Sequence, residues 1–328
     1  MIRRLLVAGL AVVVESAAVF AYLTDGTGGG TEVVSVEIPR GATTAQVGEL
    51  LRADEVIGSV LGFRILTRLR GLEGRIQAGR YEMTRDMGSW DALGVLRSPP
   101  IEKGTTVPFP PGFSVKQVAE RVAARTQIKD LHTIATNGTV RAGIMPPGVN
   151  TLEGLLYPDT YFVGERETAT DLARRMVAEF DRRTADLDWT HPESRNLSRY
   201  QAVIVASLIE REARVPEDRA KIAAVIYNRM QKGMRLQIDI TALYGLDEHK
   251  VPTRADLRRP SPYNTYLIDG LPPTPIANPG LDAIEAALAP ANIDALYYVV
   301  IDPSGKHGFT ADPNEFERLK QRRPPEVH

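Results

Sequence analysis

Two glutamates at the end of an apolar segment are the residues of this chain best placed for acid–base chemistry. The segment, residues 203–213, reads VIVASLIEREA and contains Glu210 and Glu212. Residues two apart on a helix point about 200° apart, so the two carboxyl groups cannot share one helix face. Glu212 lies one turn after the apolar side chains of Leu208 and Ile209. The apolar face of the predicted helix therefore carries Glu212.

These apolar neighbours predict a raised pKa for Glu212. A carboxyl group held against apolar side chains is poorly solvated when charged, so it can stay protonated near neutral pH, as a general acid must. Glu210 instead follows Ala206 and Ser207 and can pair with Arg214 four residues later. An amphipathic surface helix with two solvated glutamates is the alternative interpretation. We predict Glu212 as the catalytic residue, with Glu210 as the second choice.

Composition excludes several other classes of site. Lysine and arginine (40) nearly balance aspartate and glutamate (41), which argues against a nucleic-acid partner, and the chain has no cysteine. The sequence contains no phosphate-binding GxxxxGK[ST] loop, no dinucleotide-binding GxGxxG after a strand, no HExxH and no GxSxG elbow. The histidines lack ligand spacing. We therefore expect neither a cofactor nor a metal.

The N-terminal residues predict a membrane anchor. Arg3 and Arg4 precede an apolar run over residues 5–23, which is about long enough to cross a bilayer. The positive-inside rule predicts a cytoplasmic tail at 1–4, a single-pass anchor in the cell membrane at 5–23, a linker at 24–32 and an extracytoplasmic body. A cleaved signal peptide, with Ser16 and Ala18 at the cleavage site, is the alternative.

The remaining chain predicts an α+β protein built from small units. The stretches Val36–Leu51 and Val107–Val122 share six residues at one spacing, and each predicts a strand, a Pro/Gly turn and a helix with a capping box. Residues 33–100 resemble a LysM-like module, a fold often associated with glycan strands; a spacer without ligand is the alternative. Residues 101–145 form a second α+β unit and connection, and residues 146–328 a larger, mostly helical catalytic domain with short strands.

Helices and one long loop surround the two glutamates. Periodicity predicts helices over Ala169–Arg183, Ser198–Arg214, Pro216–Lys232 and Asp282–Ala289. The segment SPYNTYLIDGLPPTPIANPG, residues 261–280, is a long loop rich in proline, tyrosine and asparagine, which is costly to order unless it has a role. Its hydroxyl, amide and aromatic groups are suited to holding a carbohydrate, although a rigid cover over the helices is the alternative.

At these residues the chain resembles the MltG-type (YceG-like) endolytic murein transglycosylases. The resemblance rests on five ordered motifs: LEGLLYPDTY, ASLIEREA, VIYNRM…GMRLQIDIT, SPYNTYLIDGLPPTPIANPG and GKHGFT. It implies a bitopic membrane protein that cuts nascent peptidoglycan strands internally, terminating their elongation, with peptidoglycan synthases as further partners. Two positions depart from the family pattern: Ile240 replaces a proline after Asp239, and Phe316 stands where a histidine is common.

The resemblance also implies a mechanism with one carboxyl group. The catalytic glutamate protonates the β-1,4 glycosidic oxygen between N-acetylmuramic acid and N-acetylglucosamine, then takes a proton from the muramyl 6-hydroxyl, leaving a 1,6-anhydro end. Asp239 would stabilise the positive charge on the sugar. Alternatively, Asp239 is the second carboxylate of a hydrolytic muramidase, or the protein is a non-catalytic anchor that binds the cell wall. The substrate-binding candidates are Glu153, Tyr157, Tyr161, Ser207, Asn228, Gln237, Tyr263, Asn264, Tyr266 and His307.

Overall fold

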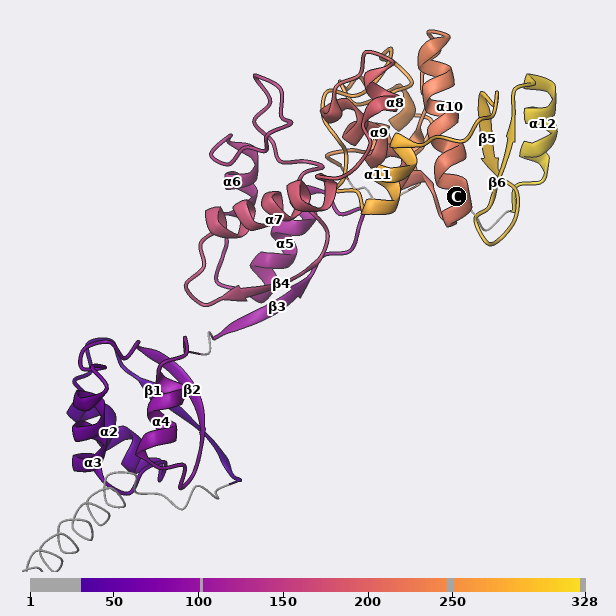
Figure 1. Ribbon diagram of the computed structural model, residues 1–328. Helices are drawn as coiled ribbons and strands as arrows, with labels where there is room; N and C mark the ends of the chain where they lie inside the picture. The colour runs from indigo at the N-terminus through magenta and orange to yellow at the C-terminus, as the bar shows by residue number, and fades with distance from the viewer. Residues whose placement is uncertain (1–30, 101–102, 247–250, 325–328) are drawn as a thin grey trace, which may run out of the picture. The chain divides into compact units, whose positions relative to one another are not determined.

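The computed structural model describes residues 31–100, 103–246 and 251–324, which divide into two compact units between Lys103 and Gly104 (Figure 1). The fold is α+β, as predicted, but the fold class needs one correction, because it included a membrane-spanning helix. Within these described ranges no helix is both long and apolar enough to cross a membrane. The predicted anchor at 5–23 lies outside the described residues.

The first unit packs helices against a two-stranded antiparallel sheet. Its elements are β1 (Val33–Ile38), α2 (Thr44–Ala53), α3 (Val60–Leu69), β2 (Gly79–Thr84) and α4 (Ser89–Leu96). Strand β1 pairs with β2, with Val36 opposite Tyr81, and both side chains are buried with Leu51 and Phe63 of the helices. Whether this unit is LysM-like stays a prediction.

The second unit holds the remaining described elements. They are β3 (Gly104–Pro108), α5 (Val115–Arg125), α6 (Leu131–Thr136), β4 (Thr160–Gly164), α7 (Ala169–Thr184), α8 (Thr190–Glu193), α9 (Arg199–Glu212), η1 (Pro216–Asp218), α10 (Arg219–Gln231), η2 (Asp239–Ala242), η3 (Asp256–Arg258), α11 (Leu281–Leu288), β5 (Tyr297–Val300), β6 (His307–Thr310) and α12 (Pro313–Gln321). Strands β3 and β4 form one antiparallel pair, and β5 and β6 form another. Residues 101–145 were predicted as a second α+β unit and connection, and the part from Gly104 onward shares one core with the helices that follow.

The repeated strand–turn–helix pattern is confirmed in both units. The helices α2 and α5 each begin with a complete capping box, formed by Thr43 with Gln46 and by Ser114 with Gln117. In each copy the turn contains a glycine with positive φ. The copy in the second unit has Gly112, at 86°, where a side chain would be strained. Its N–H donates to the carbonyl oxygen of Asn278 at 2.9 Å, which joins this turn to the loop before α11.

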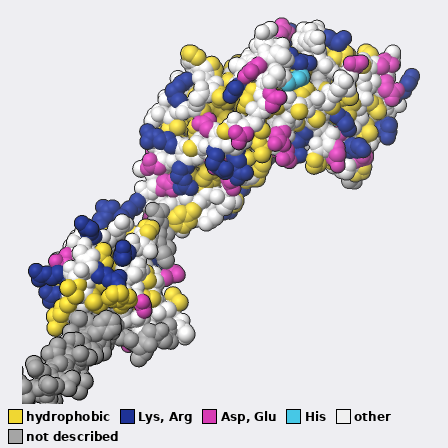
Figure 2. Space-filling view, viewed as in Figure 1, with side chains coloured by type: hydrophobic (Ala, Val, Ile, Leu, Met, Phe, Trp, Pro, Cys, Tyr) yellow, Lys and Arg dark blue, Asp and Glu magenta, His cyan; other side chains and the backbone are white. Residues whose placement is uncertain are grey.

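Helix α9 lies at the centre of the second unit. Residues 202–209 are all buried, and α9 packs against α10 and α11 (Figure 1). Acidic and basic side chains are intermixed on the face of the second unit that Figure 2 shows. This mixture agrees with the balanced composition of 40 basic and 41 acidic residues.

Candidate active site

Both glutamates stand where α9 leaves the core. The helix begins at Ser198, whose hydroxyl accepts the N–H of Gln201 at 3.2 Å while the Gln201 side chain accepts the N–H of Ser198 at 2.9 Å. This reciprocal cap fixes the start of the helix. The helix ends at Glu212, because the next residue, Ala213, has extended backbone angles. Glu210 and Glu212 therefore occupy its last turn, just beyond the buried Leu208 and Ile209.

Glu210 makes a structural contact. Its Oε2 accepts the backbone N–H of Gly280 at 3.0 Å, and Gly280 is the residue at which α11 begins. The first N–H groups of a helix have no partner within the helix, and they attract negative charge. In a capping box the third helical residue would accept this N–H, but here that residue is Ala283, so Glu210 supplies the acceptor from α9. Burial raises the pKa of Glu210, and the bond from Gly280 opposes this rise.

Glu212 has different partners. Its Oε2 accepts a hydrogen bond from the Tyr298 hydroxyl of β5 at 3.0 Å. Burial of the carboxyl group raises the pKa of Glu212 to about 7, although the Tyr298 bond lowers this pKa and the charge of Asp239 raises it. The residue as a whole is half-buried, and burial leaves its carboxyl group poorly solvated. Such a carboxyl group is partly protonated at neutral pH and can donate or accept a proton.

Asp239 and Tyr266 lie close to this carboxyl group. Asp239 begins η2 and is exposed, and the Tyr266 hydroxyl donates a short hydrogen bond to its Oδ1. The charge of Glu212 contributes to the raised pKa of Tyr266, as the charge of Asp239 contributes to that of Glu212. The structure therefore brings three predicted residues, Glu212, Asp239 and Tyr266, into one electrostatic neighbourhood.

Two buried threonines, Thr241 and Thr265, join the segment that carries Asp239 to the loop that carries Tyr266. The hydroxyl groups of Thr241 and Thr265 lie 2.9 Å apart, and both side chains are fully buried. Gln237, another predicted residue, is exposed and donates its backbone N–H to the Thr265 carbonyl oxygen at 3.1 Å. Its φ of 50° is uncommon for a residue other than glycine, and such strain clusters at functional sites. Gln237 stands two residues before Asp239 in the chain.

His307, another predicted substrate-binding residue, is buried beside Tyr298. Its ring meets the Tyr298 ring edge to face, with centroids 5.3 Å apart, and its Nδ1 lies 3.0 Å from Oδ2 of Asp218. The sequence reasoning missed Asp218 and Tyr298. Asp218 follows α9 in the segment VPEDRA, whereas Tyr298 belongs to the segment ALYYVVID, residues 295–302. Neither segment carried a signal for chemistry.

Ser207 and Asn228 face the protein interior. The Ser207 hydroxyl donates to the Ile204 carbonyl oxygen at 2.7 Å and accepts the Ile276 N–H at 3.1 Å. The Asn228 amide donates to the carbonyl oxygens of Ile293 and Ala295 at 2.8 and 3.0 Å. Both side chains tie connecting segments to the central helices.

Tyr263 and Asn264, the predicted substrate-binding residues of the loop 261–280, form hydrogen bonds within the protein. Asn264 is fully buried and donates to the carbonyl oxygens of Leu257 and Arg259 at 3.1 and 2.9 Å. The Tyr263 hydroxyl lies 2.9 Å from that of Thr274. These contacts order the loop, so they favour the interpretation of residues 261–280 as a rigid cover, with Tyr266 reaching out of it to Asp239.

Glu153 is a buried carboxylate at the start of α5. Its two oxygens accept the N–H of Val115, the first residue of that helix, at 3.0 and 3.1 Å. The Tyr244 hydroxyl donates to Oε2 at 2.8 Å. Glu153 is 2% exposed, so these contacts stabilise a helix N-terminus inside the core.

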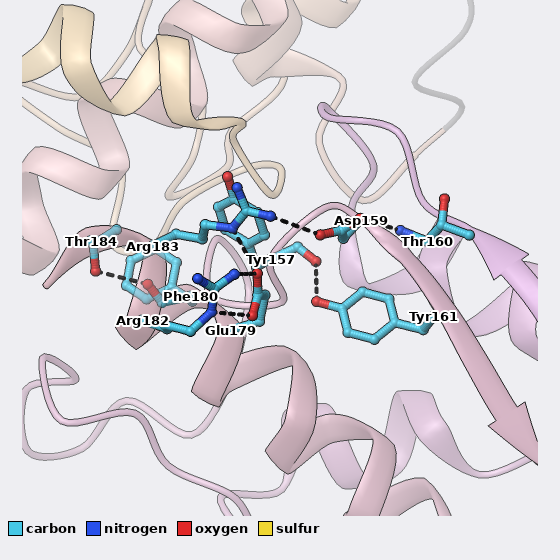
Figure 3. A network of polar contacts seen from close by, with 9 residues as sticks. All are labelled: Tyr157, Asp159, Thr160, Tyr161, Glu179, Phe180, Arg182, Arg183 and Thr184. Carbon is cyan, nitrogen blue, oxygen red and sulfur yellow. Dashed lines mark hydrogen bonds and ion pairs between the residues drawn. The ribbon is translucent and has the colours of Figure 1, made fainter.

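Tyr157 and Tyr161 lie against α7 (Figure 3). The Tyr161 hydroxyl donates to the Tyr157 carbonyl oxygen at 2.9 Å, and the Arg183 guanidinium lies 5.4 Å from the centroid of the Tyr157 ring. Arg183 in turn pairs with Glu179 at 2.7 Å. Both tyrosines are 6% exposed. Tyr161 also lies opposite Val107 of β3, and its ring centroid is 5.9 Å from that of Phe109, so both tyrosines are packed within the protein.

Comparison with known proteins gives one consistent family. The model of the YceG-like family matches residues 36–322. The chain is 31% identical over 310 residues to the endolytic murein transglycosylase of Bacillus subtilis (strain 168), covering 88% of this chain and 84% of the relative. It is 27% identical over 321 residues to the protein of that name from Streptococcus pneumoniae (strain ATCC BAA-255 / R6), covering 87% of this chain but only 57% of the relative.

A solved structure agrees with this result. The crystal structure of a YceG-like protein from Listeria monocytogenes is 30% identical to this chain, with a TM-score of 0.59. The match covers 88% of this chain and 99% of the Listeria chain. The similarity therefore includes elements of both compact units rather than the region around Glu212 alone.

Proposed function

This chain belongs to the YceG-like family, and we infer that it is an endolytic murein transglycosylase, a lyase that cuts the glycan strands of peptidoglycan internally. The relatives of this name support the reaction class, and the site supplies an acid–base residue for it. The observation that carries the inference is Glu212, whose carboxyl group has a pKa of about 7 because it is buried at the end of α9. The protein would act on strands outside the cytoplasm, and association with peptidoglycan synthases stays a prediction.

Glu212 would serve as general acid and then as general base. When protonated, it donates to the glycosidic oxygen while the bond between that oxygen and C1 of N-acetylmuramic acid breaks. The resulting carboxylate then takes the proton of the muramyl 6-hydroxyl, whose oxygen closes on C1 to give a 1,6-anhydro end. No water is consumed, and Glu212 regains its proton. A pKa close to 7 suits both steps, because neither protonation state is scarce at neutral pH.

The neighbouring residues would favour this cycle in different ways. Asp239 carries a negative charge that opposes ionisation of Glu212 and can stabilise positive charge on the sugar ring. Tyr298 donates to Glu212, so it supports the carboxylate form needed in the second step. Gln237 and Tyr266 are the remaining predicted residues beside these groups, and we propose that they contact the substrate.

Hydrolysis with Asp239 as the second carboxylate is the alternative, supported by the charge interaction through which Asp239 raises the pKa of Glu212. Digestion of uncrosslinked glycan strands in water enriched in ¹⁸O separates the two reactions. We expect 1,6-anhydro ends without ¹⁸O when the products are analysed by mass spectrometry. Reducing ends that carry ¹⁸O would show a hydrolase, and sedimentation with cell walls without any cleavage would show a binding protein.

A further inference from the structure

A buried aspartate–histidine pair anchors the strand that lies beside the partner of Glu212. His307 begins β6, and its backbone N–H and Nδ1 lie 2.7 and 3.0 Å from the same oxygen, Oδ2, of Asp218. Asp218 is fully buried and His307 is 6% exposed. Because that oxygen accepts the backbone N–H, it also acts as the acceptor for the ring, which places the proton of the neutral imidazole on Nδ1.

The pair joins two parts of the fold that are distant in sequence. Asp218 closes η1 and leads into α10, whereas His307 follows the turn of the β5–β6 hairpin. Each strand of this hairpin has four residues, and a hairpin of that size is marginally stable alone. The two bonds to Asp218 therefore fix β6, and with it β5, against the helices.

The ring of His307 continues this restraint to Tyr298. In the antiparallel register Tyr298 lies opposite Phe309, and His307 is diagonal to Tyr298 on the same face. The His307 and Tyr298 rings meet edge to face at 5.3 Å and 79°, and Phe309 lies 6.1 Å from both rings. The Tyr298 hydroxyl then reaches Glu212 at 3.0 Å.

We propose that Asp218 and His307 are positioning residues: they hold the Tyr298 ring at the angle from which its hydroxyl donates to Glu212, and so set the proton affinity of that carboxyl group. This proposal rests on the proposed function only in treating Glu212 as the catalytic residue. It differs from the sequence prediction, in which His307 contacted the substrate.

Charged groups around the pair favour a neutral ring. Burial lowers the pKa of His307, Asp218 opposes this, and the charge of Arg214 lowers it further. Lys221 lies 3.6 Å from Oδ1 of Asp218, the oxygen that does not bind the ring, and 5.4 Å from the centroid of the Phe309 ring. No described residue forms a hydrogen bond with Nε2 of His307, so Asp218 alone orients the ring through polar contacts.

The test is a direct titration of Glu212 in the purified full-length chain. The protein is labelled with ¹³C in its glutamate carboxyl groups, and Glu212→Gln identifies the signal. Loss of the hydroxyl in Tyr298→Phe removes a bond to the charged form, so we expect the pKa of Glu212 to rise by about one unit. His307→Phe keeps an aromatic ring and the backbone N–H that binds Asp218, but it loses the ring bond to Asp218, and we expect a shift in the same direction.

A double-mutant cycle tests whether the two residues act through one contact. If His307 acts through Tyr298, then Tyr298→Phe combined with His307→Phe shifts the pKa of Glu212 no further than Tyr298→Phe alone. His307→Asn, whose amide can still donate to Asp218, should restore part of the wild-type value. Tyr297→Phe is the matched control, because it removes the neighbouring hydroxyl of the same strand and should leave the pKa unchanged.

Several outcomes contradict the proposal. A folded His307→Phe protein with an unchanged pKa of Glu212, or additive shifts in the double variant, removes the link through Tyr298. If His307→Phe does not fold, Asp218→Asn is measured in its place. A folded Asp218→Asn protein in which the pKa of Glu212 does not rise also contradicts the proposal. The titration needs no substrate, so a chain that leaves glycan strands intact refutes the proposed function without deciding this question.

Discussion

Glu210 and Glu212 stand two residues apart at the end of α9, yet their carboxyl groups have unrelated partners. Glu210 accepts the N–H of Gly280 at the start of α11, whereas Glu212 accepts the hydroxyl of Tyr298 from β5. The difference follows from the helix, which turns about 200° over two residues. One glutamate therefore supports the packing of α9 on α11, and the other is free to exchange a proton.

The first prediction separates these roles by amide substitution. Glu212→Gln cannot donate or accept the proton, so we expect release of anhydro ends to fall at least 10²- to 10⁴-fold, about the contribution of general acid–base catalysis. Glu210→Gln still offers an amide oxygen to Gly280, and its activity should stay within a few-fold of wild type. Each variant is the other's control, and the reverse pattern would assign catalysis to Glu210.

The second prediction concerns the pH dependence of cleavage. Glu212 must be protonated in the free enzyme to act as a general acid, and its pKa is about 7. We therefore expect kcat/KM to decline as pH rises above about 7, with a tenfold loss per pH unit once the carboxylate dominates. Cleavage of uncrosslinked strands measured from pH 5 to 9 checks this. A decline centred near pH 4.5 would mean that the carboxyl group is solvated in solution.

The third prediction is that loss of the Asp239 charge shifts the pKa of Glu212 in the direction opposite to loss of the Tyr298 hydroxyl. The charge of Asp239 raises the pKa of Glu212, so Asp239→Asn should move the alkaline decline of kcat/KM to lower pH. The shift should be under about one pH unit, because Asp239 is exposed and screened by solvent. Loss of its charge beside the sugar should also lower kcat by about 10- to 10²-fold.

Asp269 offers a matched control for this experiment. It is an exposed carboxylate in the loop 261–280, which also carries Tyr266, and it pairs with Arg235 at 3.1 Å. Asp269→Asn should change neither the rate nor the pH profile. If Asp239→Asn behaves in the same way as Asp269→Asn, then Asp239 has no part in the site.

The local elements were readable from the sequence because local interactions decide them. The capping boxes at Thr43 and Ser114 were predicted and are present, and helix α7 ends one residue from its predicted limit. The environment of Glu212 was also predictable in part, since Leu208 and Ile209 precede it by one turn and are buried.

Contacts between distant segments were not readable in this way. Tyr298 is 86 residues from Glu212, and Asp218 is 89 residues from His307. Single-sequence periodicity carries no information on which strand returns to which helix. For the same reason Asn264 was predicted to face a ligand, whereas the structure uses its amide to hold two carbonyl oxygens of its own loop.

The fourth prediction is a cost in stability at Glu212. Its folded-state pKa of about 7 lies above the ordinary glutamate value of 4.5, so near neutral pH the folded state holds a proton that the unfolded state releases. The free energy of unfolding therefore falls as pH rises from about 4.5 to about 7. Glu212→Gln has no proton to release. Between pH 4.5 and pH 8 its free energy of unfolding should therefore rise, relative to that of wild type, by on the order of 1 to 2 kcal/mol. Urea denaturation at both pH values checks this, and an equal difference at both would contradict it.

The fifth prediction distinguishes a structural role for Glu153 from substrate binding. Glu153 is 2% exposed and accepts the first N–H of α5 with both carboxylate oxygens. Hydrogen bonds to a charged group at a helix N-terminus contribute about 2 kcal/mol, so Glu153→Gln should lower the free energy of unfolding by roughly that amount. Because the side chain does not reach Glu212, KM for glycan strands should stay within about twofold of wild type at a temperature where the variant is folded.

Glu120→Gln, on the exposed face of the same helix, should change neither quantity. A Glu153→Gln protein of unchanged stability but raised KM would return this residue to the substrate groove.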